Sequence, residues 1–581
     1  MKDMKLSEIM GENTKLASEL KGPKFEISVL SNIITTQLNE ILEYTLRKSG
    51  INAYVTSGDY DNIVQDSSKD ENLPLTIIFW EACNFLDGFQ YKYKNFSEDF
   101  LQELSSKIKS EIQLVIDNLK SRSRVIFNTF SSSLFHSESP KKDRFDFLCE
   151  DLNQFLFVNK TSNMAIVDLE KIFNQITPAN SVDWRYYYSS KALYSVEFYK
   201  QYCLHITPII FSGLGKTKKV LVLDCDNTLW KGILGEDGFD GIEMSASSKN
   251  GVYFEEIQHS VVKLAEEGVV ICLASKNNAA DVDQVLLNHK DIVLKDSHIV
   301  SKKVNWNDKA SNIKELSEQL NLGLDSFVFV DDSDFEINLV KEKLPQVTCF
   351  QVPKKLYQYP SLFREIEQLF FKFNTSKEDM ERVAMYKKEQ LRDSEKTNFG
   401  NVEDYLSSLG LKLHIYVDDE KLIERIAQLT QKTNQFNLTT LRYSEADIET
   451  FMKNANSKVL AFGLADKFGD YGITGVSILK IKPENSFANI DSFLMSCRIL
   501  GRNAETVFFD YMMQLLKSEK VHTVESKFAK TEKNSQVESF YDTLGFKILN
   551  STEEEKSYRL DLDSYSFHNI NYIEVIDGRK S

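Results

Sequence analysis

Two aspartates, two residues apart, follow an apolar run near the middle of the chain. The run Val220–Leu223 leads into Asp224, Cys225 and Asp226. A carboxylate can attack phosphorus when a metal ion offsets the repulsion between the two anions, and a second carboxylate two residues on can transfer the proton of the leaving group. We therefore interpret Asp224 as the candidate nucleophile and Asp226 as the candidate general acid/base.

Further polar residues stand at comparable positions downstream. Ser275 follows the apolar run VVICLA, and Lys309 opens the helical pattern that precedes another apolar run, FVFV. A hydroxyl and an ammonium group can hold phosphoryl oxygens and neutralise the charge that develops on them. Together with Thr228, which completes the spacing DxDxT, these residues are the candidate phosphate-binding set.

A candidate metal site completes this group. Asp331 and Asp332 follow directly on FVFV. The predicted cofactor is Mg²⁺, which prefers oxygen ligands and keeps several waters. The predicted ligands are the Asp224 carboxylate, the main-chain carbonyl of Asp226 and the Asp331 carboxylate. Asp332 is expected to matter less, because adjacent side chains at a strand end point to different sides.

The elements that must position these residues alternate between strand and helix. Apolar strand patterns at VLVLDCD, VVICLAS, SFVFVDD and VTCFQV are separated by helical patterns at Glu255–Glu267, Ala279–Asn288, Asp308–Leu320 and Phe335–Lys343. Strands that are apolar on both faces and alternate with helices indicate a parallel, Rossmann-like sheet with right-handed crossovers. Ligands of such sheets bind beyond the carboxyl ends of the strands, where all of the candidate residues stand.

The order DxDxT, Ser, Lys and DD matches the four motifs of the haloacid dehalogenase superfamily. The longer stretches VLVLDCDNTLWKGILGEDGFDGI, LASKNN and FVFVDDSDFEIN resemble its subfamily IIIC, the FkbH-like proteins. The resemblance implies an enzyme that takes a glyceryl unit from a phosphorylated three-carbon donor, dephosphorylates it and loads it onto the thiol of an acyl-carrier protein.

Two alternatives stay open beside this resemblance. A phosphatase of a small sugar phosphate, for instance in surface-polysaccharide assembly, would use the same motifs with water as the acceptor. A binding scaffold with inactive sites is disfavoured, because the whole set of candidate residues is intact. Cys225 is a candidate for carrying a thioester-linked glyceryl group, but strand alternation points it away from its two neighbouring aspartates, which favours a packing role.

The N-terminal segment shows a strand, helix and strand pattern. Its opening, FEISVLSN, resembles a degraded first block of the SGNH hydrolases, with Ser31 at the nucleophile position. A serine after a strand is more often a helix cap, here for the predicted helix Thr35–Ser49. The DxxH pattern of such hydrolases is absent from Met164–Phe211. We predict a non-catalytic lid or docking module.

The C-terminal segment resembles the GNAT acyltransferases. The resemblance rests on the strand pair FGLADKFGDYGITGVSILK, the loop SCRILGRNAE before a helix, and VESFYDTLGFKIL. Main-chain N–H groups at a helix N-terminus can hold a pyrophosphate, so Arg498, Gly501 and Arg502 are candidates for binding acyl-CoA or the pantetheine arm of a carrier protein. Asn503 stands where the last Gly of the RxxGxG pattern is expected.

Length and composition indicate the number of domains, the class of partner and the cellular compartment. A chain of 581 residues is too long for one core, and we predict a multidomain α/β protein with an SGNH-like domain at 1–213, a haloacid dehalogenase-like domain at 214–353, a helical connector at 354–410 and a GNAT-like domain at 411–581. The net charge of −16 disfavours nucleic acid as a partner. Seven scattered cysteines and the lack of a signal peptide or an apolar run of membrane-spanning length predict a cytoplasmic protein without a membrane span.

Overall fold

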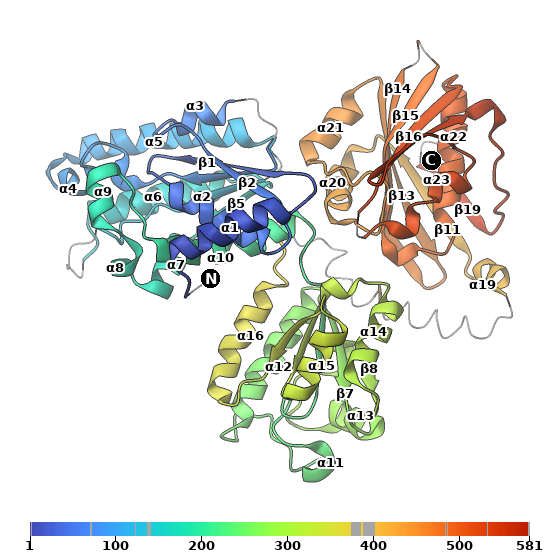
Figure 1. Ribbon diagram of the computed structural model, residues 1–581, viewed down its shortest axis with the longest axis horizontal. Helices are drawn as coiled ribbons and strands as arrows, with labels where there is room; N and C mark the ends of the chain where they lie inside the picture. The colour runs from blue at the N-terminus through green and yellow to red at the C-terminus, as the bar shows by residue number, and fades with distance from the viewer. Residues whose placement is uncertain are drawn as a thin grey trace. The chain divides into compact units, whose positions relative to one another are not determined.

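The computed structural model describes residues 1–581 except 2, 70–72, 123, 136–140, 374–384, 387–400, 483, 485, 532 and 579–581. The chain divides into two compact units, Met1–Ile210 and Phe211–Ser581. Together they contain three β-sheets with helices packed against them (Figure 1), which confirms the prediction of a multidomain α/β protein. Within the described residues, no helix is long and apolar enough to cross a lipid bilayer.

The first unit is built on a parallel sheet of five strands in the order β2-β1-β3-β4-β5. Its strands are β1 (Phe25–Ser31), β2 (Ala53–Ser57), β3 (Leu75–Phe79), β4 (Val125–Asn128) and β5 (Met164–Val167). Its helices are α1 (Leu6–Glu19), α2 (Thr36–Arg47), α3 (Ile63–Ser67), α4 (Phe89–Lys92), α5 (Glu98–Leu119), α6 (Arg144–Asn159), α7 (Leu169–Ile176), α8 (Pro178–Ser181), α9 (Trp184–Ser190) and α10 (Val196–Gly213).

Ser31 lies at the end of β1 and does not cap the following helix. Thr35 is the residue that precedes the first turn of α2. The Ser31 hydroxyl oxygen instead accepts a hydrogen bond from the main-chain N–H of Ile33 at 3.0 Å. The expectation of a helix cap is therefore wrong, because the chain makes a short turn between Ser31 and the helix.

The middle segment forms a second parallel sheet of five strands, in the order β10-β9-β6-β7-β8. Its strands are β6 (Val220–Leu223), β7 (Val270–Ser275), β8 (Ile299–Val304), β9 (Phe327–Asp331) and β10 (Thr348–Gln351). Its helices are α11 (Leu234–Asp237), α12 (Gly251–Glu266), α13 (Ala279–Asn288), α14 (Lys309–Leu320), α15 (Asp334–Lys343) and α16 (Tyr359–Gln368).

Both faces of this sheet are apolar and covered by helices, as the run of buried residues in the central strand requires. Leu221 and Leu223 pack with side chains of α12, α13 and α16 on one face. Val220 and Val222 pack with side chains of α14 and α15 on the other. Figure 1 shows the helices on the two sides of the strands. Helix α16, which lies in the stretch predicted as a connector, thus contributes to the core of this sheet.

The C-terminal segment forms a mixed sheet in which β15–β16 and β11–β19 pair in parallel and the remaining neighbours on its main path are antiparallel. Its strands are β11 (Leu411–Val417), β12 (Phe436–Asn437), β13 (Ser457–Asp466), β14 (Gly469–Lys482), β15 (Phe487–Met495), β16 (Thr523–Ala529), β17 (Lys547–Ser551), β18 (Glu555–Asp561) and β19 (Ile573–Asp577). Its helices are α19 (Val402–Ser408), α20 (Ile423–Lys432), α21 (Glu445–Lys453), α22 (Ala504–Ser518) and α23 (Phe540–Thr543).

Candidate active site

The candidate residues of the middle segment meet at one edge of its sheet. The central strand β6 lies between β9 and β7, and Leu223 pairs with Val330 on one side and with Leu273 on the other. Asp224 follows Leu223 directly, and its main-chain N–H donates to Val330 at 3.1 Å. Because the three strands are parallel, the polar residues at their carboxyl ends come together, as the sequence predicts.

Lys309 connects two of the carboxylates. Asp308 caps α14 by accepting a hydrogen bond from the main-chain N–H of Ser311, so that Lys309 is the first residue of the helix. Its ammonium Nζ lies 2.8 Å from Asp224 Oδ1 and 2.5 Å from Asp331 Oδ2. All three side chains of this ion-pair cluster are buried. A charge-assisted contact of this kind fixes both carboxylates in place.

Burial and mutual repulsion shift the proton affinities of the site. Burial raises the pKa of Asp224, and the positive charge of Lys309 partly offsets that rise. The pKa of Asp331 is raised by burial first and by the negative charge of Asp224 second. Burial opposes the charge of Lys309, but its two carboxylate partners raise its pKa above the ordinary value. The site therefore favours a bound cation, which would lower the cost of holding several carboxylates together.

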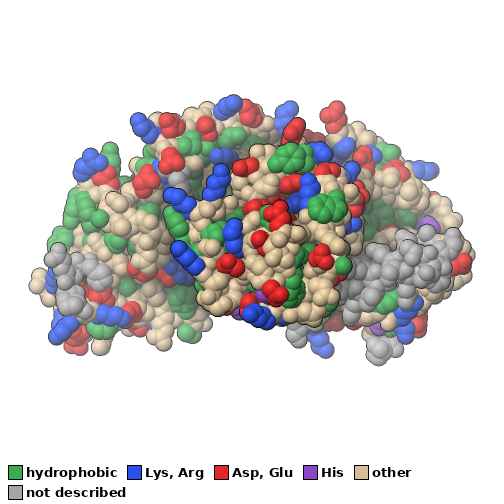
Figure 2. Space-filling model, turned by 90° about the horizontal axis from the view of Figure 1, so that it is seen from below, with side chains coloured by type: hydrophobic (Ala, Val, Ile, Leu, Met, Phe, Trp, Pro, Cys, Tyr) green, Lys and Arg blue, Asp and Glu red, His purple; other side chains and the backbone are tan. Residues whose placement is uncertain are grey.

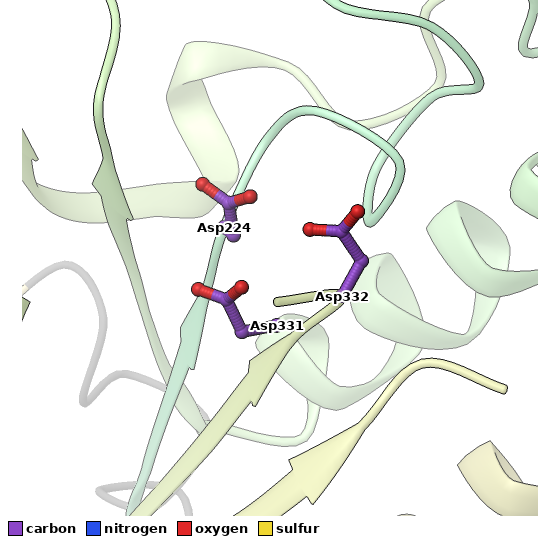
Figure 3. A group of neighbouring side chains, drawn as sticks. All are labelled: Asp224, Asp331 and Asp332. Atoms are coloured by element: carbon purple, nitrogen blue, oxygen red, sulfur yellow. The ribbon is translucent and has the colours of Figure 1, made fainter. Parts of the chain in front are cut away.

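Three carboxylates form a group suited to a divalent cation. One oxygen from each of Asp224, Asp331 and Asp332 lies within 4.8 Å of the others. Figure 3 shows the three side chains arranged around a common space, with Asp224 just beyond the end of one strand and the other two at the end of its neighbour. Carboxylate oxygens are the ligands that Mg²⁺ prefers. Asp332, which was expected to matter less, thus joins the group.

Asp226 faces a different set of partners. Its Oδ1 accepts hydrogen bonds from the indole Nε1–H of Trp230 at 2.9 Å and from the main-chain N–H of Leu234 at 3.0 Å. Its Oδ2 accepts from the Asn277 amide at 2.9 Å. The same amide nitrogen donates to the Ser275 hydroxyl oxygen at 3.1 Å. The candidate acid/base and the candidate phosphate-binding serine are therefore joined by one side chain.

Thr228 and Cys225 are both fully buried. The Thr228 hydroxyl oxygen has no hydrogen-bond partner among the described residues, while its main-chain oxygen accepts from the Tyr359 hydroxyl at 3.2 Å. Cys225 packs in the apolar cluster that contains Leu221 and Leu223. Burial raises the pKa of its thiol well above the ordinary value. A buried thiol that resists ionisation is a poor nucleophile, so its surroundings favour packing.

The candidate loop of the C-terminal segment links β15 to α22. Gly501 has a φ of 76° and Asn503, at the start of the helix, has a φ of 61°. Arg502 is buried, its guanidinium lies 5.1 Å from the centre of the Tyr471 ring, and it donates to the main-chain oxygen of Arg498 at 2.7 Å. The loop thus turns directly into the helix N-terminus, with the Arg502 side chain directed into the domain.

Sequence analysis did not assign roles to Asn277 and Trp230. Both stand in motifs that the sequence shows, LASKNN and DCDNTLW. The spacing of a motif does not reveal which of its polar groups points at a neighbouring strand end, and this requires the fold. The signal in the sequence was the pair Asn277 and Asn278, which follows the apolar strand run after Ser275 and Lys276, since only one of two adjacent asparagines is needed to cap the next helix.

Comparisons with known proteins agree with this site. The family model of the NLI interacting factor-like phosphatases matches residues 219–370. A crystal structure of the N-terminal part of the protein BF1531 from Bacteroides fragilis, described as containing a phosphatase domain complexed with Mg, is similar with a TM-score of 0.55 and 25% sequence identity, covering 64% of this chain and 100% of that chain. The comparison with curated proteins gives no match.

Two further solved structures are similar at a lower level. The ribosomal-protein-S18-alanine N-acetyltransferase from Escherichia coli has a TM-score of 0.21 and 12% identity, covering 27% of this chain and 97% of that chain. Tetrahymena GCN5 has a TM-score of 0.18 and 8% identity, covering 26% of this chain and 88% of that chain.

The matched residues contain the whole middle sheet and α16. The parallel sheet, the carboxylate group at its edge and the family match together define a phosphatase domain of the haloacid dehalogenase type. The chain is therefore an enzyme.

Proposed function

We propose that this chain is a Mg²⁺-dependent phosphatase in which Asp224 is the nucleophile. The observation that carries the proposal is the group formed by Asp224, Asp331 and Asp332, whose ligand oxygens lie within 4.8 Å of one another. Three hard oxygen donors suit Mg²⁺, and the similar phosphatase domain from Bacteroides fragilis was crystallised as a complex with Mg. When bound there, the ion would offset the repulsion between Asp224 and the phosphate of the substrate.

Further residues of the site have separate roles in the proposed reaction. Asp224 attacks phosphorus, and Lys309, which holds Asp224 and Asp331 in place, neutralises charge on the phosphoryl oxygens. Ser275, beside Asp224 at the end of the neighbouring strand, donates its hydroxyl to the same oxygens. Asp226 transfers the proton of the leaving group. The proposal keeps Thr228 in the phosphate-binding set, since its hydroxyl oxygen is buried and has no hydrogen-bond partner among the described residues.

The finer proposal concerns the substrate and the acceptor. We infer from the FkbH-like motifs that the donor is a phosphorylated three-carbon acid with an activated carboxyl group: the thiol of an acyl-carrier protein attacks the carboxyl carbon and displaces the activating group, and the phosphate ester of the glyceryl unit is hydrolysed at Asp224. The buried Cys225 supports a thiol supplied by the partner over a thiol of this chain. Trp306 and Phe335 follow β8 and β9 at the same edge as the carboxylates and are 76% and 67% exposed, which supports contact with a protein partner.

One face of the molecule carries charged and apolar side chains together. Figure 2 shows acidic side chains grouped near the centre of the face that it draws, with exposed hydrophobic side chains beside them and Lys and Arg side chains spread among them. In this proposal the first unit, 1–213 by the predicted boundary, is a docking module, and the loop with Arg498 and Gly501 at the α22 N-terminus receives the phosphate of the pantetheine arm.

The experiment uses the full chain with a three-carbon acid that carries a phosphate ester and an activated carboxyl group, together with a phosphopantetheinylated carrier protein. Phosphate release should require Mg²⁺ and stop on addition of EDTA, and the carrier protein should gain the mass of a glyceryl group. Asp224→Asn should abolish both, whereas Asp240→Asn, a change at an exposed aspartate of the same domain, should not. Phosphate release without loading would favour a phosphatase with water as acceptor, and release that survives EDTA would refute the metal site.

A further inference from the structure

Asn277 stands at the centre of the site without touching any of the metal-binding carboxylates in the described contacts. It follows β7 by two residues, and its side chain is only 6% exposed. Its amide nitrogen has two hydrogens, and two acceptors lie in range: Asp226 Oδ2 at 2.9 Å and Ser275 Oγ at 3.1 Å. One amide group therefore satisfies both neighbours at once.

The rest of the Asp226 carboxylate is held from the opposite side. Trp230 Nε1–H and the Leu234 N–H both donate to Oδ1, and both belong to the connection between β6 and α12. Asn277 is the one donor to Oδ2 in the described contacts. The two donors to Oδ1 fix one oxygen of the carboxylate, and the Asn277 contact fixes the direction of the other oxygen, Oδ2.

We propose that Asn277 is a positioning residue that orients the Asp226 carboxylate toward the leaving oxygen. By donating to Ser275 as well, it holds the carboxylate and the Ser275 hydroxyl in a fixed arrangement relative to each other. This inference rests on the phosphatase function proposed above. In the first step, the phosphoryl group moves from the ester oxygen to the Asp224 carboxylate, and the leaving oxygen takes a proton from Asp226. In the second step, Asp226 takes a proton from water as the water oxygen bonds to phosphorus, and the bond from phosphorus to Asp224 breaks.

The next residue offers a matched control. Asn278 is also an asparagine, but its side-chain oxygen accepts a hydrogen bond from the main-chain N–H of Ala280 at 3.1 Å and so caps α13. A change at Asn278 weakens a helix end next to the site without removing a contact to Asp226. Comparing the two positions separates a loss of local stability from a loss of orientation.

The test compares two aryl phosphates in the presence of Mg²⁺. p-Nitrophenolate leaves readily without a proton, whereas phenolate, with a pKa of about 10 like that of tyrosine, depends on protonation. The quantity measured is kcat/KM, which reports the steps up to the first release of the leaving group. Positioned proton transfer contributes on the order of 10²- to 10⁴-fold, so Asn277→Asp should reduce kcat/KM at least about tenfold more for phenyl phosphate than for p-nitrophenyl phosphate.

Asn277→Asp has the same shape but donates no hydrogen bond and places a like charge beside Asp226. Asn277→Ala removes the donor without adding charge and serves if the first variant does not fold. Asn277→Ala, which adds no charge, should leave the Mg²⁺ concentration needed for half-maximal activity unchanged. Asp226→Asn should show the same dependence on the leaving group, and adding Asn277→Ala to it should cause little further loss.

Three results would overturn the inference. Equal losses for the two esters in the Asn277 variants would show a merely structural role. The same dependence on the leaving group in Asn278→Ala would show that the effect belongs to the loop and not to the Asp226 contact. A wild type without Mg²⁺-dependent activity toward both esters would refute the proposed phosphatase function itself. This result differs from the other two, in which the wild type is active and only the behaviour of the variants contradicts the inference.

Discussion

Replacing Lys309 by methionine should destabilise the phosphatase domain most strongly at high pH and without metal. The change keeps the length of the side chain and removes the charge that lies 2.8 Å from Asp224 and 2.5 Å from Asp331. Removing one partner from a buried ion pair costs about 3–5 kcal/mol. For a domain of this size that corresponds to a decrease in Tm of roughly 6–20 °C.

The dependence on pH follows from the direction of the pKa shifts. The pKa values of Asp224 and Asp331 are already raised by burial, and Lys309 opposes the rise in both. Without Lys309 they rise further, so the folded domain binds protons more tightly than the unfolded chain. Stability is then lost as the pH rises through the folded pKa values, and the Tm difference from the wild type should be larger at pH 8 than at pH 5.

The assay is differential scanning calorimetry of the full chain in EDTA and in Mg²⁺ at both pH values. Mg²⁺ supplies positive charge to the same carboxylates, so it should raise the Tm of Lys309→Met more than that of the wild type. Lys303→Met is the control, since Lys303 pairs with Glu315 near the surface and such pairs contribute about 0–1 kcal/mol. An unchanged Tm in Lys309→Met, or an equal decrease at pH 5 and pH 8, would refute this account of the site.

Three further outcomes follow from individual residues. Asp331→Ala and Asp332→Ala should each raise the Mg²⁺ concentration needed for activity, because both carboxylates belong to the cation-binding group; titration of activity with Mg²⁺ checks this, and an unchanged requirement would contradict it. Glu81 is buried with a pKa raised from 4.5 to about 7, so ionisation disfavours the folded first unit by up to about 3 kcal/mol as the pH rises across that interval. Glu81→Gln, which can still accept the hydrogen bond that Tyr194 donates, should increase its Tm at pH 8 but not at pH 4, and an equal effect at both would count against the shift. Arg498→Ala should weaken binding of a phosphopantetheinylated carrier protein by roughly tenfold or more in calorimetric titration, and wild-type affinity in the variant would exclude this role.

The sequence predicts the middle sheet well because its signals are local and consistent. The helix predicted at Ala279–Asn288 forms with those bounds, and the strands before Asp224 and Asp331 are buried on both faces. Placing the carboxylates at one edge needs only the rule that parallel strands end together. The same rule brings Ser275 to the site from the neighbouring strand.

What sequence analysis missed depends on contacts between distant segments. The direction of the Asp332 side chain depends on the turn after β9. The role of Asn277 depends on its contact with Asp226, which lies 51 residues earlier in the sequence, in the connection after β6. The part played by α16 in the core of the sheet likewise comes from tertiary packing. A charged helical stretch after the last strand has the pattern of a connector whether or not it packs against a sheet.

The central claim is that Asp224 carries the phosphoryl group during turnover. The direct measurement is a rapid acid quench of the full chain with Mg²⁺ and p-nitrophenyl phosphate, followed by mass spectrometry of its peptides. We predict that the peptide containing Asp224 gains one phosphoryl group, that hydroxylamine removes it as expected of an acyl phosphate, and that Asp224→Asn shows none. Turnover with the phosphoryl group on another residue, such as Asp226 or Ser275, would contradict the account.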